Sequence, residues 1–106
     1  MSNPLERAIE IIVKVADPDQ IILFGSQARG DARPNSDYDI CVLKSGMAHR
    51  RKLTQQIYRS LLGVGVPVEV IVETPERFDA LKDNPFLIYR EIARYGSVIY
   101  EQREYR

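Results

Sequence analysis

The sequence predicts a single α/β domain, and two observations support this. Short runs of apolar and β-branched residues, at 21–24, 37–43 and 68–74, have the length and composition of strands. Longer segments with apolar residues at helical spacing alternate with these runs. At 106 residues the chain can build one modest core but not two. We therefore expect one domain over residues 1–100 and a flexible charged tail over residues 101–106.

The first elements begin with clear local signals. Asn3 has the position of an N-cap, Pro4 that of a first helical residue, and Glu6 that of a capping-box partner. An apolar face follows at helical spacing, formed by Leu5, Ala8, Ile9, Ile12, Val13 and Ala16. The apolar run 21–24 then predicts a strand that is buried on both faces.

The second half of the chain predicts further helices and strands. Strands are expected at 68–74 and, as an edge strand, at 98–100. Helices are expected over about 47–62, from Thr74-Pro75 onward, and from Asn84-Pro85 to Gly96. The last of these helices carries an apolar stripe, formed by Ile88, Ile92 and Tyr95.

A Gly-Ser turn follows the first strand directly. Gly25 lets the backbone approach a ligand closely, and Ser26 adds a hydroxyl donor. Residues 27–29 favour a helical turn, so the free N–H groups at its start would point toward one place. The turn is therefore a candidate phosphate site, although Gly-Ser turns are also common in loops that bind nothing.

Two carboxylates follow in the next strand, after a predicted turn over residues 33–36. Asp37 and Asp39 would project from the same face, because side chains alternate along a strand. Their repulsion costs stability unless a cation lies between them, and such hard oxygen ligands suit Mg²⁺ or Mn²⁺. The alternative is a solvated strand start, since aspartate is common near turns. The Gly-Ser turn just upstream leads us to favour metal ligation.

A third carboxylate is expected on the strand 68–74. Glu69 is an ionised side chain within an otherwise apolar run, which is costly unless it is paired or bound to a metal. If this strand lies beside the one that carries Asp39, Glu69 can complete a cluster of three carboxylates. Glu73 would share its face but lie nearer the strand end, as a solvated rim residue, so we favour Glu69.

The joined pattern of Gly25-Ser26, Asp37-x-Asp39 and a later strand carboxylate resembles the polymerase-β nucleotidyltransferase superfamily. Residues 28–33 and 36–39 resemble the sequence around the site in its minimal nucleotidyltransferase (MNT) branch. Residues 92–100 resemble the C-terminal segment of the same branch. The resemblance implies the polymerase-β-type fold, a small mixed β-sheet flanked by helices. One departure is Glu69, where many relatives carry aspartate.

The resemblance also implies an activity and a partner. Asp37, Asp39 and Glu69 would be the catalytic metal ligands, and Gly25 and Ser26 would hold the phosphates of a nucleoside triphosphate. Members of this branch are frequently paired with a small helical HEPN toxin, for which they act as antitoxin. The implied reaction is Mg²⁺-dependent AMP transfer from ATP to a tyrosine of that partner. Arg29 is a candidate phosphate contact, but solvation on a helix surface explains it nearly as well.

The composition is compatible with a nucleotidyltransferase but excludes few other functions. The chain carries 15 basic and 15 acidic side chains, so overall charge gives no reason to expect direct nucleic-acid binding. A basic stretch between Asp39 and Glu69, with Lys44, Arg50, Arg51, Lys52 and Arg59, is interpreted as the solvated face of a helix rather than a binding rim. Cys41 is the only cysteine and is expected to be buried and inert.

The remaining expectations concern location, assembly and rival functions. Without a membrane-spanning stretch or a signal-peptide pattern, we expect a cytoplasmic protein that does not contact membranes. A chain of this length has no second lobe to hold an acceptor, so a homo- or hetero-oligomer is expected. One rival function is a module that neutralises its partner by binding alone. Another is a transferase that acts on a small molecule as a dimer.

Overall fold

The computed structural model describes residues 3–33 and 36–102. The elements, in chain order, are α1 (Pro4–Ala16), β1 (Gln20–Phe24), α2 (Ser26–Arg29), β2 (Tyr38–Leu43), α3 (Arg50–Ser60), β3 (Val68–Glu73), α4 (Pro75–Leu81), α5 (Ile88–Tyr95) and β4 (Ser97–Glu101). Pro34 and Asn35 of the predicted turn, and residues 103–106 of the predicted tail, lie outside the described residues.

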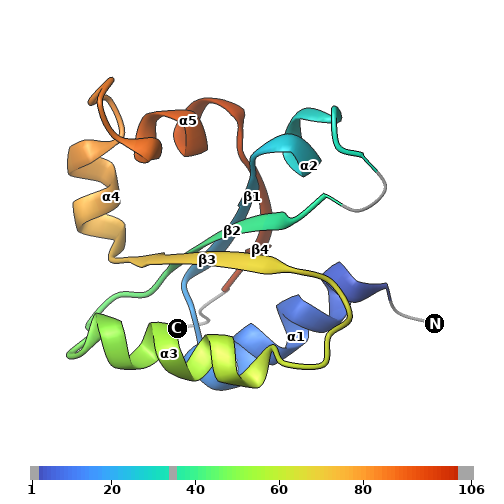
Figure 1. Cartoon of the computed structure of the whole chain (residues 1–106). Helices are drawn as coiled ribbons and strands as arrows, with labels where there is room; N and C mark the ends of the chain where they lie inside the picture. The colour runs from blue at the N-terminus through green and yellow to red at the C-terminus, as the bar shows by residue number, and fades with distance from the viewer. Residues whose placement is uncertain (1–2, 34–35, 103–106) are drawn as a thin grey trace.

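The strands form one mixed sheet with the order β3-β2-β1-β4. β1 is antiparallel to both β2 and β4, whereas β2 and β3 are parallel, with α3 in the connection between them. The sheet lies between two layers of helices, α1 and α3 on one face and α4 and α5 on the other (Figure 1). This arrangement confirms the predicted mixed sheet with flanking helices.

The core has two parts, one on each face of the sheet. Because side chains alternate along β1, Ile21 and Leu23 pack toward α1 and α3, while Ile22 and Phe24 pack toward α4 and α5. The first part also takes Ile12 and Ile57, both fully buried. β1 is thus buried on both faces, as predicted.

Local signals set several element boundaries correctly. The Asn3 side chain accepts a hydrogen bond from the Glu6 N–H at 2.8 Å, which caps α1 as expected. Thr74 caps α4 in the same way, through the Arg77 N–H at 3.1 Å. Gly96 ends α5, and its N–H donates to the Ile92 carbonyl.

The predicted start of α5 is wrong. The helix begins at Ile88 rather than at Asn84-Pro85, because Asn84 closes a separate turn before it. The Asn84 side chain accepts from the Phe86 N–H at 2.9 Å, and its carbonyl accepts from the Leu87 N–H at 3.2 Å. α3 is also shorter than predicted, since it begins at Arg50 rather than at about Met47.

The predicted apolar stripe of α5 holds at one position only. Ile92 is buried, with 1% of its surface exposed, whereas Ile88 and Tyr95 are 45% and 57% exposed. α5 is a short helix that contacts the sheet mainly through β1, so a narrow strip of its surface is covered. Arg51, Lys52 and Arg59 of α3 are exposed, as predicted for a solvated helix surface, whereas Arg50 is paired with Glu73.

The prediction that Glu73 is a solvated rim residue is also wrong. Glu73 is only 2% exposed and is the buried acidic residue of the described core. One carboxylate oxygen accepts from the Tyr89 hydroxyl at 2.6 Å and from Arg50 at 3.0 Å, and lies 3.4 Å from Arg77. The other accepts from the Thr74 N–H at 3.0 Å. Glu73 therefore joins α3, α4 and α5 to the end of β3.

Burial also sets the chemistry of two neighbours of Glu73. Cys41 is fully buried on β2, and burial, followed by the negative charge of Glu73, raises the pKa of its thiol to about 12. This confirms the expected inert thiol. Burial and the hydrogen bond to Glu73 raise the pKa of Tyr89, also to about 12.

Within residues 3–33 and 36–102, no helix has both the length and the apolar character needed to cross a membrane.

Candidate active site

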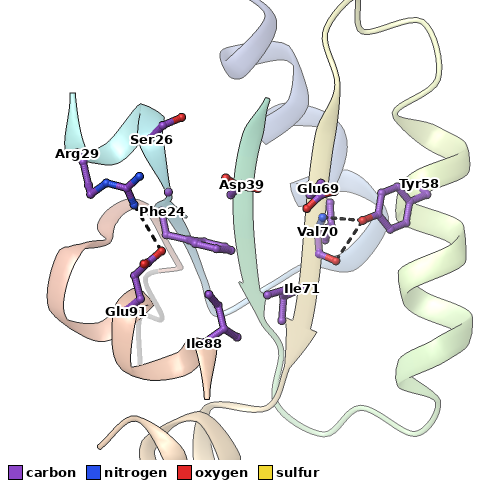
Figure 2. A pocket seen from close by; sticks show the side chains of 11 residues that line it. Phe24, Ser26, Arg29, Asp39, Tyr58, Glu69, Val70, Ile71, Ile88 and Glu91 are labelled. Atoms are coloured by element: carbon purple, nitrogen blue, oxygen red, sulfur yellow. Dashed lines mark hydrogen bonds and ion pairs between the residues drawn. The ribbon is translucent and has the colours of Figure 1, made fainter. Parts of the chain in front are cut away.

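Five of the six predicted site residues line one hollow. It has a volume of about 530 Å³ and lies where β1, β2 and β3 meet α2, α3 and α5. The five residues are Gly25, Ser26, Arg29, Asp39 and Glu69. Figure 2 shows the side chains of the other four, without Gly25, on three elements, with α2 on one side of Asp39 and β3 on the other. Segments far apart in the sequence therefore build one site.

The Gly25 turn brings α2 directly against Asp39. Gly25 adopts a φ of +74°, a backbone conformation that residues other than glycine rarely adopt. A Cβ at this position would collide with a carboxylate oxygen of Asp39. The Gly25 carbonyl accepts from the N–H groups of Ala28 and Arg29, each at 3.1 Å, which starts α2. Ser26 and Gln27 precede these bonds, so their N–H groups belong to the first turn, which has no intrahelical acceptors.

Replacing Gly25 by alanine is therefore expected to damage both the fold and the site. The backbone conformation of Gly25, with φ of 74° and ψ of −157°, costs about 1–3 kcal/mol for a residue with a Cβ, and the collision would displace the Asp39 carboxylate. We expect a lower melting temperature and at least tenfold weaker AMP-PNP binding, measured by thermal denaturation and calorimetry. Gly46→Ala is the matched control, since Gly46 also has a positive φ, +68°, but open space around it. It should lose stability and keep its affinity for AMP-PNP; equal affinity losses in both variants would contradict the role of Gly25.

Asp39 and Glu69 lie side by side on parallel neighbouring strands, on the same face of the sheet. They are register partners in the pairing of β2 with β3, and both line the hollow. Burial is the main cause that raises the pKa of Asp39, and the charges of Glu69, Asp37 and Glu91 raise it further, whereas Arg29 lowers it. The site thus gathers several carboxylates at a cost to the ionised form of Asp39.

Asp37 lies differently from the prediction. β2 begins at Tyr38, so Asp37 precedes the strand, is exposed, and does not line the hollow. It is still near enough for its charge to raise the pKa of Asp39. The expected strand face shared by Asp37 and Asp39 therefore begins at Asp39.

Glu69 has the predicted position but not the predicted burial. It is exposed, because β3 is an edge strand of the sheet and Glu69 lies near its start. The sequence favours Glu69 because burying a charged side chain is costly. In the structure this cost applies to Glu73, which is the buried carboxylate at the end of the same strand.

Sequence reasoning missed Glu91 and Tyr58. Glu91 enters the hollow from α5, and its carboxylate lies 3.6 Å from Arg29 of α2 (Figure 2). Tyr58 of α3 also lines the hollow, and its hydroxyl accepts from the Val70 N–H at 2.8 Å on the outer edge of β3. The spacing of α5 residues gave no signal for Glu91, because only the packing of α5 beside α2 brings it there.

Among the residues that the structure describes, no group of three or more His, Cys, Asp or Glu side chains is arranged to hold a metal ion. The predicted three-carboxylate metal site thus remains a prediction. Mg²⁺ commonly binds through one or two carboxylates together with substrate phosphates, rather than in a site made only of protein. Asp39 and Glu69 are two neighbouring carboxylates of like charge, and they could supply the oxygen ligands of such a Mg²⁺ site.

Comparisons with known proteins identify relatives over most of the chain. Residues 5–97 match the family model described as nucleotidyltransferase domain. Protein adenylyltransferase MntA of Aphanizomenon flos-aquae is 26% identical over 99 residues, which are 92% of this chain and 66% of that protein. This chain therefore spans just under two thirds of the length of MntA. A putative protein adenylyltransferase of Methanocaldococcus jannaschii is 36% identical over 81 residues, 76% of this chain and 77% of that protein.

Two solved structures share the fold. A putative nucleotidyltransferase from Sulfolobus solfataricus superimposes with a TM-score of 0.62 and 22% identity, over 96% of this chain and 90% of that one. A chain from a crystal structure of a toxin-antitoxin with AMP-PNP gives a TM-score of 0.58 and 22% identity, over 92% of this chain and 74% of that one. At this level of identity, the similarity supports the fold alone.

Proposed function

This chain belongs to the nucleotidyltransferase domain family, and on that premise we propose that it transfers AMP from ATP to a protein hydroxyl. The observation that carries this proposal is the convergence of the Gly25-Ser26 turn with Asp39 and Glu69 in one hollow. The names of two relatives, both protein adenylyltransferases, support a protein acceptor and AMP as the transferred group.

The turn at Gly25 would bind the phosphates of ATP. The Ser26 hydroxyl and the first N–H groups of α2 supply donors, and Arg29 at the end of α2 supplies a positive charge on the same wall. Phe24, Ile71 and Ile88 give the hollow an apolar part, against which a nucleoside could pack. These residues together would hold and orient the nucleotide.

Asp39 and Glu69 would hold Mg²⁺, with Asp37 able to add an oxygen ligand from the segment before β2. Mn²⁺ satisfies the same oxygen donors. A bound divalent ion supplies positive charge that offsets the negative charge of the phosphates and of the carboxylates. Burial, followed by the charges of the neighbouring carboxylates, raises the pKa of Asp39, and a cluster of this kind is suited to binding such a positive charge.

The proposed step is an in-line displacement at the α-phosphorus of ATP. The acceptor hydroxyl oxygen forms a bond to the α-phosphorus, the bond to the bridging oxygen breaks, and pyrophosphate leaves. Glu69, exposed at the rim of the hollow, accepts the hydroxyl proton. The products are a phosphodiester-linked AMP on the acceptor and pyrophosphate, so atoms and charge balance.

The acceptor we propose is a tyrosine of a HEPN-type toxin, with this chain as its antitoxin. Support comes from the resemblance to the MNT branch and from the shared fold with a chain of a toxin-antitoxin structure. This chain would then neutralise its partner by modifying it, as one half of a hetero-oligomer.

Position-specific labelling of ATP tests the reaction class. The HEPN-type partner is incubated with the chain, Mg²⁺ and ATP labelled at either the α- or the γ-phosphate. Transfer of the α-label alone to the partner supports nucleotidyl transfer. Transfer of the γ-label would instead indicate a kinase. Loss of partner toxicity without transfer of either label would favour neutralisation by binding.

A further inference from the structure

Arg29 has two acidic partners that differ in kind. Its Nε lies 3.3 Å from Asp31, two residues along the chain and outside the hollow. Its Nη1 lies 3.6 Å from Glu91, which comes from α5 and lines the hollow beside α2 (Figure 2). The contact with Asp31 is thus local, whereas the contact with Glu91 joins two helices that are far apart in the sequence and both line the hollow.

Glu91 stands on a fixed support. The next residue, Ile92, is 1% exposed and packs under the sheet. Two residues before Glu91, the Tyr89 hydroxyl donates to the buried Glu73 at 2.6 Å. These contacts hold α5 in place, so the backbone of Glu91 is fixed beside the hollow.

The charges of the hollow make this ion pair consequential for an anionic ligand. Asp39, Glu69 and Glu91 contribute negative charge to the lining, and Arg29 contributes positive charge. While Glu91 pairs with Arg29, part of that positive charge is neutralised. The pair is half-exposed, with 40% of each side chain accessible, so it is weak and easily exchanged. A phosphate group offers the guanidinium a stronger, bidentate partner.

We propose that Glu91 is a positioning residue that competes with the nucleotide phosphates for the Arg29 guanidinium. In the empty site Glu91 holds Arg29 against α5, and in the nucleotide complex Arg29 turns to the phosphates. Glu91 thereby lowers the affinity for nucleotide and regains Arg29 when pyrophosphate leaves. This inference rests on the proposed nucleotide site, but it does not depend on a protein acceptor.

A double-mutant cycle with AMP-PNP and Mg²⁺ tests the proposal, with dissociation constants measured by calorimetry at physiological ionic strength. Glu91→Gln should tighten binding about threefold to fivefold, because removing the carboxylate frees Arg29. In the Arg29→Gln background the same change should tighten binding clearly less, because the gain through Arg29 is lost and only the direct repulsion between Glu91 and the phosphates remains. The control Glu10→Gln removes one exposed negative charge from α1, on the opposite face of the sheet, and should leave binding unchanged.

The cycle has outcomes that overturn the proposal. Equal tightening in both backgrounds would mean that Glu91 acts through its field and not through Arg29. Weaker binding by Glu91→Gln would mean that Glu91 orients Arg29 toward the phosphates, and no change would remove any role in binding. Melting temperatures of all variants should stay close to wild type. Failure of AMP transfer with an intact cycle would overturn the proposed function and leave this inference standing.

Discussion

Replacing Asp39 by asparagine is expected to abolish AMP transfer and to raise the melting temperature of the chain. Asp39 lines the hollow between the Gly25 turn and Glu69, so its loss removes a proposed ligand for Mg²⁺ and should lower transfer by about 10³-fold. Without metal, the same carboxylate faces Glu69 across neighbouring strands. Relief of a like-charge cross-strand pair is worth about 0.2–1 kcal/mol, or roughly 1–5 °C in melting temperature.

The stability difference should depend on pH in a defined sense. The pKa of Asp39 is raised above its ordinary value of 3.8, so between the two values the folded chain binds a proton that the unfolded chain does not. The stability of the wild type therefore falls as the pH rises through this window and stays lower above it. Wild type and Asp39→Asn should melt alike in acid, and the variant should melt higher at neutral pH.

Thermal denaturation over this pH range, without metal, measures the effect. Asp83→Asn is the matched control, because Asp83 is exposed and does not line the hollow. It should change neither the melting temperature nor AMP transfer. An Asp39→Asn protein that melts below wild type at neutral pH would contradict the repulsion argued for the site. Retained transfer would contradict its proposed role in metal binding.

Glu73→Ala is expected to have the largest effect on stability. It removes the acceptor of the Tyr89 hydroxyl and of the Thr74 N–H, and leaves a small cavity in a side chain position that is only 2% exposed. The ion pairs with Arg50 and Arg77 add less, because both arginines are more than half-exposed. We expect a loss of about 2–4 kcal/mol, or roughly 10–25 °C in melting temperature.

Glu69→Ala provides a control on the same strand and the same face. Glu69 is exposed, so its truncation should change stability by less than about 1 kcal/mol while it impairs transfer. Chemical denaturation of both variants compares the two residues directly. Similar stability losses would contradict the assignment of Glu73 to structure and Glu69 to the site. Glu73→Gln should recover much of the stability, since its side-chain oxygen can still accept from Tyr89.

The parts of the site predicted from sequence are those set by local signals. Gly25 and Ser26 follow the apolar strand β1 directly, and Asp39 lies near the start of the next strand, β2. The local sequence pattern is therefore enough to predict their positions. Glu69 was placed by the alternation of side chains once its strand was assumed to lie beside β2, which the parallel register confirms.

The parts that could not be predicted depend on tertiary packing. Glu69 and Glu73 have the same residue type and the same strand face, and only the helices around the end of β3 decide that Glu73 is buried. Glu91 reaches the hollow because α5 packs beside α2, which no spacing within α5 reveals. The predicted start of α5 is wrong because the Asn84 side chain closes a turn. An asparagine that closes a turn and one that caps a helix both accept from a nearby backbone N–H, so the sequence does not distinguish them.

Intact mass spectrometry of a HEPN-type partner, after incubation with this chain, ATP and Mg²⁺, tests the central claim most directly. We expect the partner to gain the mass of one or more AMP groups with the wild type and none with Asp39→Asn. A partner that is neutralised equally by both proteins, without any gain in mass, would contradict AMP transfer as the function of this site.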